Sequence, residues 1–460
     1  MNTFISKRGY SLLKDELTTN QLQTLRKDLT AKPYVNKDYP GDNQPFPVYL
    51  ESHRKIYLPR YYGIEKYGMP KKNTLKPGKE IDVSFSKELR ELQKNIVKKY
   101  LEVAKQTGGG IISVPCGYGK TVIALYILAH LKVKTLIVVH KEFLMNQWKE
   151  RIEQFLNNYK IGRIQGSIFD IKNKNIVLGM LQSISMKDFA EDAFDSFGLV
   201  IFDECHHLGA EVFSRALFKT SFKYTLGLSA TPKRTDGLQK VFEWYLGKIV
   251  FQIKKRHLEE VNVKVIKYYE EDETYSKIEM NYQGKPNTSK MMNNVCDYYP
   301  RNELIVNEIK TCIDEKRKIL ILSNRKNQLQ TINEMIGNYC EKGFYLGGMK
   351  EKELKESEEK QVLLATFSMA EEGLDCKDLD TVFLVSPKSN IEQAVGRILR
   401  KEADKRDKIP LVVDILDCFS TFDKQGDKRL KFYKKNKYSV DITDLTPFKN
   451  QESDEELDFI

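Results

Sequence analysis

With 460 residues, 41% hydrophobic and 30% charged, the chain is long enough for two domains of about 100 to 200 residues each and a smaller segment. Its apolar runs are too short for a membrane span, and the N-terminus carries no signal-peptide core. The seven scattered cysteines form neither a disulfide framework nor a zinc site. We therefore expect an intracellular protein. The net charge of +11 suits a polyanionic partner such as nucleic acid, and we expect no membrane partner.

Residues 1–78 differ in composition from the rest and predict a small N-terminal accessory domain. Leucines recur at loose helical spacing over 12–29, and 48–50 and 55–58 are typical of short strands between turns. Basic residues interleaved with tyrosines would suit contacts with nucleic acid. A surface module packed on the first lobe would have the same composition, so both interpretations stay open.

Strands and helices alternate over residues 79–255, which predicts a first α/β lobe with a parallel sheet covered on both faces. Ligands bind such sheets at the carboxyl ends of the strands. The strands are expected at 111–114, 135–139, 176–179, 199–202 and 224–228, and the helices at 121–131 and 142–155.

A glycine-rich turn joins the first of these strands to its helix, and its sequence, VPCGYGKT over 114–121, predicts a phosphate-binding loop. Backbone N–H groups and the helix N-terminus favour phosphate there. Lys120 is expected to reach the β- and γ-phosphates of ATP, and the Thr121 hydroxyl to ligate Mg²⁺. Val114 stands where the strict pattern has a small residue, so the loop alone does not exclude an ordinary turn.

Asp203 and Glu204 follow the buried run 199–202, at a strand end where a metal and a triphosphate would lie. Asp203 is expected to hold the metal, and Glu204 to orient and deprotonate the attacking water. Because the phosphate loop precedes them on the same lobe, a plain acidic loop is the weaker interpretation.

Two further segments indicate a functional role only because they accompany these acids. Ser229 and Thr231 stand at a strand end, where small hydroxyl groups can relay hydrogen bonds towards the second lobe, with His206 as a partner. Gln93 can recognise adenine through two hydrogen bonds, although a solvated helix face is the preferred interpretation when it is taken alone.

Residues 256–298 are polar and charged and are expected to form an inter-lobe linker. A second alternation over 299–450 predicts another parallel-sheet lobe, followed by an acidic tail at 451–460. The strands of this lobe are expected at 318–322, 361–366, 380–385 and 409–415, and its helices at 301–315, 326–339 and 390–400.

Arg397 and Arg400 lie three positions apart on the last of these helices and are expected to project from one face. Across a cleft from the phosphate loop, they would neutralise the charge that develops on the γ-phosphate, as arginine fingers do. The segment from Thr366 to Asp375 begins at a strand end and is expected to sense both nucleotide and bound strand.

In order and spacing, these segments resemble the motifs of superfamily 2 helicases over about residues 85–420. The matching segments are Gln93, PCGYGKT, DECHH, SAT, ATFSMAEEGLD and QAVGRILR. PCG, the Gln147-Trp148 pair and GLSATPKR are similar to the XPB branch of DNA-directed translocases, and the N-terminal segment and size resemble the transcription-associated helicases of large nucleocytoplasmic DNA viruses. The resemblance implies an α/β fold of two tandem RecA-like lobes with a small N-terminal accessory domain, and ATP and Mg²⁺ as cofactors.

The resemblance also implies roles for individual residues. ATP would be bound by Arg90, Gln93, Pro115, Cys116, Gly117, Tyr118, Gly119, Lys120, Thr121, Gly373, Asp375 and Gln393. Lys120, Asp203, Glu204, Arg397 and Arg400 would be catalytic, Thr121 and Asp203 would bind Mg²⁺, and His206, Ser229 and Thr231 would couple the lobes. Nucleic acid would contact Lys141, Gln182, Ser183, Arg325 and Thr366.

We therefore expect a monomeric, nucleic-acid-dependent ATPase that acts on DNA rather than RNA, with transcription or repair machinery as partner. If the chain is viral, we expect it in the host cytoplasm or the virion. Three alternatives stay open: an RNA helicase, the motor of a restriction-type nuclease, and a non-catalytic nucleic-acid-binding protein. The chain outside the lobes offers no evident nuclease cluster, and the intact Lys120, Glu204 and Arg400 argue against the non-catalytic hypothesis.

Overall fold

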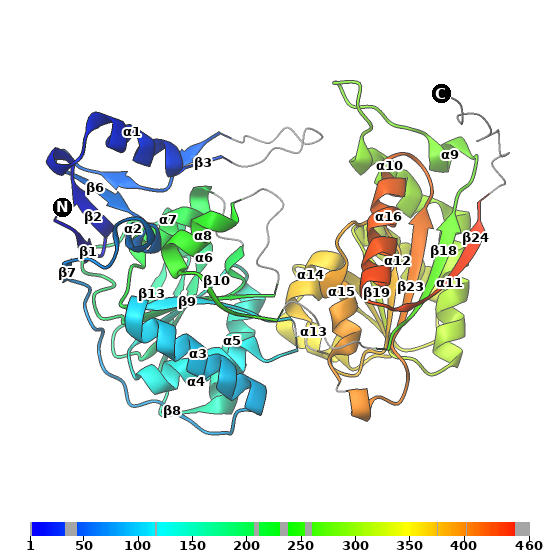
Figure 1. Cartoon of the computed structure of the whole chain (residues 1–460). Coiled ribbons are helices and arrows are strands. Elements are labelled where there is room, and N and C mark those ends of the chain that lie inside the picture. Colours follow the sequence, from blue (N-terminus) through cyan, green and yellow to red (C-terminus); the bar gives the residue numbers. More distant parts are fainter. Residues whose placement is uncertain are drawn as a thin grey trace. The chain divides into compact units, whose positions relative to one another are not determined.

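A computed structural model describes residues 2–32, 44–115, 117–206, 211–230, 238–253, 260–374, 376–401 and 403–446. The chain divides into two compact units, Met1–Lys255 and Arg256–Ile460, whose elements are labelled in Figure 1. No helix among the described residues is long and apolar enough to cross a membrane. Cys116, Thr231, Asp375 and the tail 451–460 lie outside the described residues.

An eight-stranded sheet lies at the centre of the first unit, in the order β13-β12-β14-β10-β15-β16-β9-β17. All neighbours are parallel except β12 and β13, so the predicted parallel α/β sheet is confirmed. The strands are β9 (Gly109–Ser113), β10 (Thr135–Val139), β12 (Ile161–Gln165), β13 (Ile168–Asp170), β14 (Ile176–Met180), β15 (Leu199–Phe202), β16 (Tyr224–Ser229) and β17 (Ile249–Gln252).

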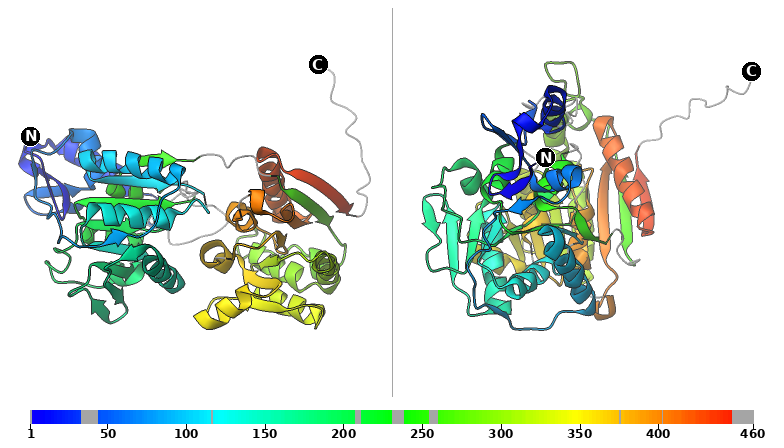
Figure 2. Two further views of the ribbon diagram at one scale, coloured as in Figure 1. Left: turned by 90° about the horizontal axis from the view of Figure 1, so that it is seen from below. Right: turned by 60° about the vertical axis from the view of Figure 1, so that its left-hand side comes forward.

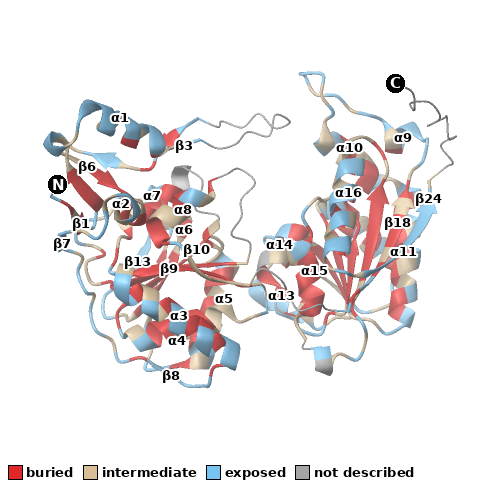
Figure 3. Cartoon of the chain, in the orientation of Figure 1, coloured by how far each residue is buried: buried red, intermediate tan, exposed pale blue. Residues whose placement is uncertain are grey.

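Helices cover both faces of this sheet, and its central strands are buried (Figures 2 and 3). Successive strand residues point to opposite faces, so Ile112 and Ile137 pack in one apolar core and Ile111 and Leu136 in the other. The first core includes residues of α3 (Glu91–Thr107), α4 (Lys120–Leu131) and α5 (Glu142–Phe155). The second includes residues of α6 (Leu181–Met186), α7 (Glu211–Lys219) and α8 (Gln239–Leu246).

The N-terminal residues form a small sheet of their own, with the order β5-β6-β2-β1-β7. Its elements are β1 (Phe4–Ser6), β2 (Gly9–Leu13), β5 (Leu50–Glu51), β6 (Lys55–Leu58) and β7 (Lys72–Asn73), with helices α1 (Thr19–Asp28) and α2 (Arg60–Tyr67). The helix predicted over 12–29 starts only at Thr19, because the Thr18 hydroxyl accepts a hydrogen bond from Gln21 N and caps the helix there. Two short pairs, β3 (Thr30–Ala31) with β4 (Phe46–Pro47) and β8 (Ser84–Phe85) with β11 (Leu156–Asn157), complete the unit.

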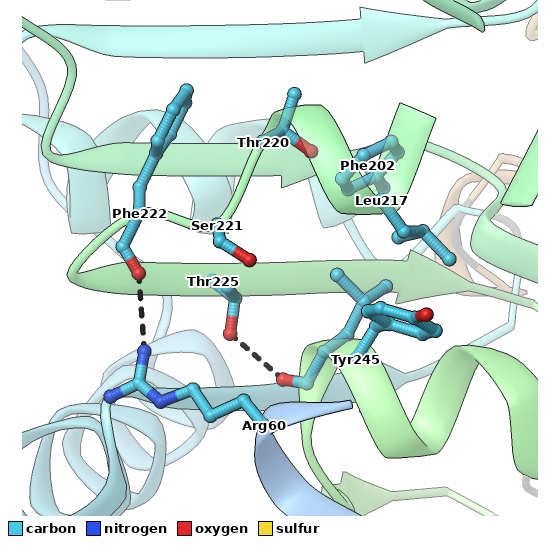
Figure 4. A pocket seen from close by; sticks show the side chains of 9 residues that line it. Arg60, Phe202, Leu217, Thr220, Ser221, Phe222, Thr225 and Tyr245 are labelled. Carbon is cyan, nitrogen blue, oxygen red and sulfur yellow. Dashed lines mark hydrogen bonds between the residues drawn. The ribbon is translucent and has the colours of Figure 1, made fainter. Parts of the chain in front are cut away.

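This N-terminal module shares one apolar core with the sheet face that α6, α7 and α8 cover. Arg60 on α2 donates hydrogen bonds to the carbonyls of Phe222 (3.1 Å) and Lys223 (3.0 Å), and the Tyr61 hydroxyl lies 2.7 Å from Thr225 Oγ1. Arg60 and Thr225 are among the residues that line a small cavity (Figure 4), which has a volume of about 10 Å³. This volume is at the lower limit for one water molecule, so the contact is a packed interface rather than a ligand pocket.

A seven-stranded sheet, parallel throughout, forms the second unit in the order β20-β21-β19-β22-β23-β18-β24. The strands are β18 (Asn262–Tyr268), β19 (Ile319–Ser323), β20 (Lys342–Tyr345), β21 (Val362–Thr366), β22 (Thr381–Leu384), β23 (Leu411–Asp417) and β24 (Ser439–Leu445). The helices are α9 (Glu273–Ser276), α10 (Thr288–Asp297), α11 (Tyr299–Asp314), α12 (Lys326–Ile336), α13 (Glu351–Glu358), α14 (Phe367–Gly373), α15 (Glu392–Val395) and α16 (Ser420–Lys435). Two parallel-sheet lobes with a small N-terminal sheet confirm the predicted fold class.

Two predictions for the second unit were wrong. The stretch 256–298 is not a linker over its described part, because β18 pairs with both β23 and β24 inside the sheet and α9 and α10 follow it. The helix predicted over 390–400 ends at Val395, and Gly396–Leu399 continues as a 3₁₀ turn. Glycine weakens a helix interior, which is consistent with a change of winding at Gly396.

Candidate functional site

The phosphate-loop segment and the paired acids meet at one edge of the first sheet. β9 and β15 both border β16 and run parallel to it, so the segments that follow β9 and β15 leave the same edge. Lys120 Nζ lies 3.0 Å from Glu204 Oε1, with only 12% and 15% of the two side chains exposed. The structure therefore brings together two groups that are 84 residues apart in sequence.

Gln93 lies directly against the loop that precedes α4. Its Nε2 donates to the Tyr118 carbonyl at 3.2 Å, and its Oε1 accepts from Arg90 N at 3.0 Å. These two bonds fix the orientation of the amide and leave one N–H donor and one acceptor lone pair on it. Adenine requires one donor and one acceptor of this kind for recognition by two hydrogen bonds. Gly119 has a φ of +78°, and a Cβ there would lie 2.5 Å from Gln93 Nε2, so this close approach requires glycine.

The remaining loop residues differ in exposure. Pro115, Tyr118 and Thr121 are half-buried and Gly117 is exposed. Thr121 lies in the first turn of α4, where the free N–H groups and the positive end of the helix dipole favour an anion.

The carboxylate of Asp203 is held at both oxygens. Oδ2 accepts a hydrogen bond from Trp148 Nε1 at 2.8 Å, and Oδ1 accepts one from Glu204 N at 3.0 Å. Glu204 itself has a φ of +44°, a left-handed conformation that is costly for a residue with a Cβ. Such strain is most often found at functional sites.

Burial and charge move the pKa values of the two acids in opposite directions. Burial and the Glu204 charge raise the pKa of Asp203, and Lys120 and the Trp148 bond oppose them only in part. Burial alone would raise the pKa of Glu204 too, but the charges of Lys120 and His206 outweigh it and hold that pKa below its usual value. A deprotonated Glu204 is the form that can accept a proton.

His206 connects the acids to the end of the neighbouring strand. Its Nδ1 lies 3.1 Å from Ser229 Oγ and 3.4 Å from Glu204 Oε2. β15 and β16 are thus joined at their carboxyl ends by a polar bridge, in which Ala230 N also donates to Glu204 Oε2 at 3.4 Å. Thr231, the third residue expected in this group, lies outside the described residues.

In the second unit, the two motif arginines differ in their surroundings. Arg397 is only 3% exposed, and its guanidinium donates to the carbonyls of Leu374 (2.9 Å) and Glu371. Arg400 is half-buried. The two arginines therefore differ in burial. Residues three positions apart in a 3₁₀ turn share a face, so the expectation that both project from one face stays a prediction. Nearby, Gly373 accepts a bond from the Tyr345 hydroxyl at 3.1 Å and Gln393 on α15 is half-buried.

The expected nucleic-acid contacts fall at the carboxyl ends of neighbouring strands in each unit. Lys141 follows β10, and Gln182 and Ser183 follow β14, which pairs with β10. In the second unit, Arg325 follows β19 and Thr366 ends β21, which pairs with β19.

Several of these side chains also form hydrogen bonds with residues of their own unit. Gln182 Nε2 donates to the His140 carbonyl at 2.9 Å, and Ser183 Oγ accepts from Gly166 N at 3.0 Å. Arg325 donates to Asn293 and Ser289 on α10.

Trp148 contacts the site but was not among the predicted site residues. It is 2% exposed on α5, and its pairing with Gln147 indicates only the similarity to the XPB branch. The sequence indicates only that the N–H of a buried indole needs a hydrogen-bond acceptor, and not which residue supplies it.

Two family models match the chain in the order of its lobes. "Type III restriction enzyme, res subunit" matches residues 86–234, and "Helicase conserved C-terminal domain" matches residues 301–402.

Individual relatives agree with these models. "Putative ATP-dependent RNA helicase" of Acanthamoeba polyphaga mimivirus is 37% identical over 96% of this chain and 86% of its own length. "Putative helicase" of Invertebrate iridescent virus 6 is 29% identical over 77% of this chain and 83% of its own. The DNA 3'-5' translocase XPB2 of Sulfurisphaera tokodaii is 37% identical over 41% of this chain and 40% of its own length. The chain belongs to the superfamily 2 helicases and is a nucleic-acid-dependent ATPase of the helicase or translocase type.

Proposed function

We propose that this protein is a DNA-directed motor that hydrolyses ATP at the carboxyl edge of its first sheet and uses each turnover to advance along a strand. The observation that carries the proposal is the contact between Lys120 and Glu204, which puts a phosphate-binding cation beside an acid whose lowered pKa keeps it deprotonated. Gln93 completes this group as the adenine-recognising amide.

Asp203 and Thr121 fit a magnesium ion that is shared with the triphosphate. Carboxylate and hydroxyl oxygens are the hard ligands that Mg²⁺ prefers, and it binds through one or two carboxylates plus phosphates rather than in an all-protein cage. In the described part of the chain, no cluster of three or more His, Cys, Asp or Glu could hold a metal alone, which agrees with this mode. When bound, the ion would neutralise charge on the phosphates. Asp203 would hold it, and Glu204 would orient the attacking water and accept its proton.

Arg400 is our candidate for the cation that the second lobe supplies during hydrolysis. Arg397 is bound to the carbonyls of Glu371 and Leu374, so we assign it the role of holding this segment in place. In the proposed cycle, ATP on the first lobe draws Arg400 towards the γ-phosphate, and hydrolysis releases it. Contacts with the phosphate backbone at Lys141, Gln182, Ser183, Arg325 and Thr366 would grip the strand without sequence preference.

The preference for DNA rests on the similarity to a DNA translocase and on the segments HKEFLMNQW and GLSATPKR. The relative from mimivirus is named as an RNA helicase, and this favours RNA as the second candidate substrate. We further propose a monomer that acts with transcription or repair machinery, in an infected cell if the chain is viral like the relatives from mimivirus and iridescent virus.

Phosphate release by the full chain, titrated with matched single-stranded DNA, duplex DNA and RNA, tests the proposal. We expect DNA to stimulate turnover and RNA to do so weakly. Stimulation by RNA alone would replace DNA with RNA as the substrate. Absence of ATP turnover with every nucleic acid would favour the non-catalytic alternative, and cleavage of duplex DNA would favour the restriction-type motor.

A further inference from the structure

Trp148 is the one indole that contacts the acids of the ATP site among the described residues. The chain has two tryptophans, and the other, Trp244 on α8, packs edge-on against Tyr62 of the N-terminal module with ring centroids 5.5 Å apart. Trp148 Nε1 lies 2.8 Å from Asp203 Oδ2. An indole has a single N–H and no acceptor, so this bond uses the whole polar capacity of the side chain.

Packing fixes the position of this donor. The Trp148 ring is 2% exposed and belongs to the same apolar core as Leu144, Ile152 and Ile201. Interiors of this kind are close-packed, so the indole has no room to rotate away from Asp203. Because Glu204 N holds the other oxygen, the plane of the Asp203 carboxylate is set from two sides.

The helix that carries Trp148 also begins at a candidate strand contact. Lys141 is the N-cap residue of α5, and the carbonyl of the preceding His140 accepts the hydrogen bond from Gln182. A shift of Asp203 would therefore act, through a rigid indole, on the helix whose first turn lies among the proposed nucleic-acid contacts.

We propose that Trp148 is the positioning residue of the metal-binding carboxylate, and that it links occupancy of the ATP site to α5. This inference rests on the proposed function, because it takes Asp203 as the residue that holds Mg²⁺. In this role Trp148 acts through Asp203, by presenting one carboxylate orientation, as partners of metal ligands commonly do.

The first test is optical and uses Trp244→Phe, which leaves Trp148 as the single indole. Emission is measured with a non-hydrolysable ATP analogue, with Mg²⁺ or with a chelator. We expect a change that needs both Mg²⁺ and the analogue and that disappears when Asp203→Asn is added. An emission unchanged by Mg²⁺ and analogue, in protein that still binds the analogue, would overturn the proposal.

The second test uses Trp148→Phe, which keeps an aromatic ring in the core and removes the N–H. The Mg²⁺ concentration needed for half-maximal binding of a fluorescent ATP analogue should rise about 10-fold, the lower end of the range for lost partners of metal ligands. Binding of the analogue without Mg²⁺ should not change.

A matched control is Trp244→Phe, which makes the same chemical change far in sequence and should leave Mg²⁺ dependence as in the unchanged chain. If Asp203→Asn raises the Mg²⁺ requirement and Trp148→Phe does not, the positioning role alone fails. If Asp203→Asn has no effect either, both this inference and the metal assignment of the proposed function fail.

Discussion

Lys120 Nζ and Glu204 Oε1 lie 3.0 Å apart, so the loop that would bind phosphate and the acid that would activate water hold one another in place. A triphosphate that attracts the lysine would loosen this pair and free the glutamate for the water. The same contact makes Lys120 important for two steps, binding of the phosphates and release of the base.

Replacing Lys120 tests this double role. In Lys120→Ala, ATP turnover should fall by at least ~10²–10³-fold, the usual loss when a charge-stabilising donor is removed from an active site. The rate of phosphate release at saturating DNA measures this turnover. Lys98→Ala, an exposed lysine on α3, is the control and should retain full turnover. Turnover by Lys120→Ala within a few-fold of the control would contradict the phosphate-loop assignment.

The two motif arginines should behave differently. Arg400→Ala should keep ATP binding and lose about 10³-fold in hydrolysis, as expected when a transition-state arginine is removed. Arg397→Ala removes hydrogen bonds to the carbonyls of Glu371 and Leu374, so hydrogen exchange in 367–374 should accelerate as well. Equal exchange in both variants, or full activity in Arg400→Ala, would disprove the separation of roles.

If the Gln93 amide binds the base, the site should prefer adenine to guanine. In Gln93→Ala, the KM for ATP should rise about 10-fold, because two hydrogen bonds of roughly 0.5–1.5 kcal/mol each are lost. The KM for GTP should change less, since guanine presents a different donor and acceptor pattern. Lys94→Ala, the exposed neighbour, is the control. An equal increase for both nucleotides would instead indicate that Gln93 acts only by holding Tyr118.

A buried ion pair in the second unit predicts a large effect on stability. Arg301 binds Asp417 through two bonds of 2.7 and 2.8 Å, and neither side chain is exposed. Asp417→Asn leaves a buried cation without its counter-charge, and loss of one member of a buried ion pair typically costs about 3–5 kcal/mol. Hydrogen exchange of β18 and β23 should accelerate, while β10 in the first unit serves as an internal reference.

The exposed pair Lys352–Glu356 gives the matched control for that variant. Its side chains are 89% and 63% exposed, and such pairs contribute roughly 0.3–0.5 kcal/mol. Glu356→Gln should therefore leave exchange in β18 and β23 unchanged. A similar effect from both substitutions would show that charge alone, and not burial, governs stability in this unit.

Acidification should act on the N-terminal module through Glu51. Hydrogen bonds from Arg26 and Lys14 lower its pKa from 4.5 to about 2, against the opposing effect of burial. A lowered folded-state pKa means that the stabilisation is fully present above about pH 4.5 and is lost as the pH falls through about 2. Glu51→Gln should thus be less stable than the unchanged chain at pH 6, and the difference should shrink as the pH falls to about 2.

Unfolding followed by circular dichroism across this pH range measures the difference. Glu65→Gln, at an exposed carboxyl on α2, is the control and should parallel the unchanged chain. A difference between Glu51→Gln and the unchanged chain that is as large at pH 2 as at pH 6 would exclude Glu51 ionisation as its cause.

The central strands could be predicted because buried parallel strands are continuous apolar runs. The predictions 135–139 and 199–202 coincide with β10 and β15. β18 was missed because its polar residues alternate with valines, and β24 because all of its residues are exposed. Strands of this kind are recognised only by the partners that they pair with.

The chemistry of the site could be predicted from residue types, but its contacts could not. Carboxylates at a strand end and a glycine loop before a helix indicate phosphate chemistry wherever they occur. The bond between Trp148 and Asp203 joins positions 55 residues apart and depends on the packing of α5. The hydrogen bonds from Arg397 to the carbonyls of Glu371 and Leu374 depend on where that segment packs, which the spacing of the two arginines does not reveal.

The apolar core common to the N-terminal module and the first sheet limits how the chain can be shortened. A version that starts near residue 79 would leave the Tyr245 hydroxyl without the Val48 carbonyl, and would strip the carbonyls of Phe222 and Lys223 of their guanidinium partner, Arg60. We expect such a fragment to aggregate during expression, and biochemists who want a minimal ATPase should keep the module attached.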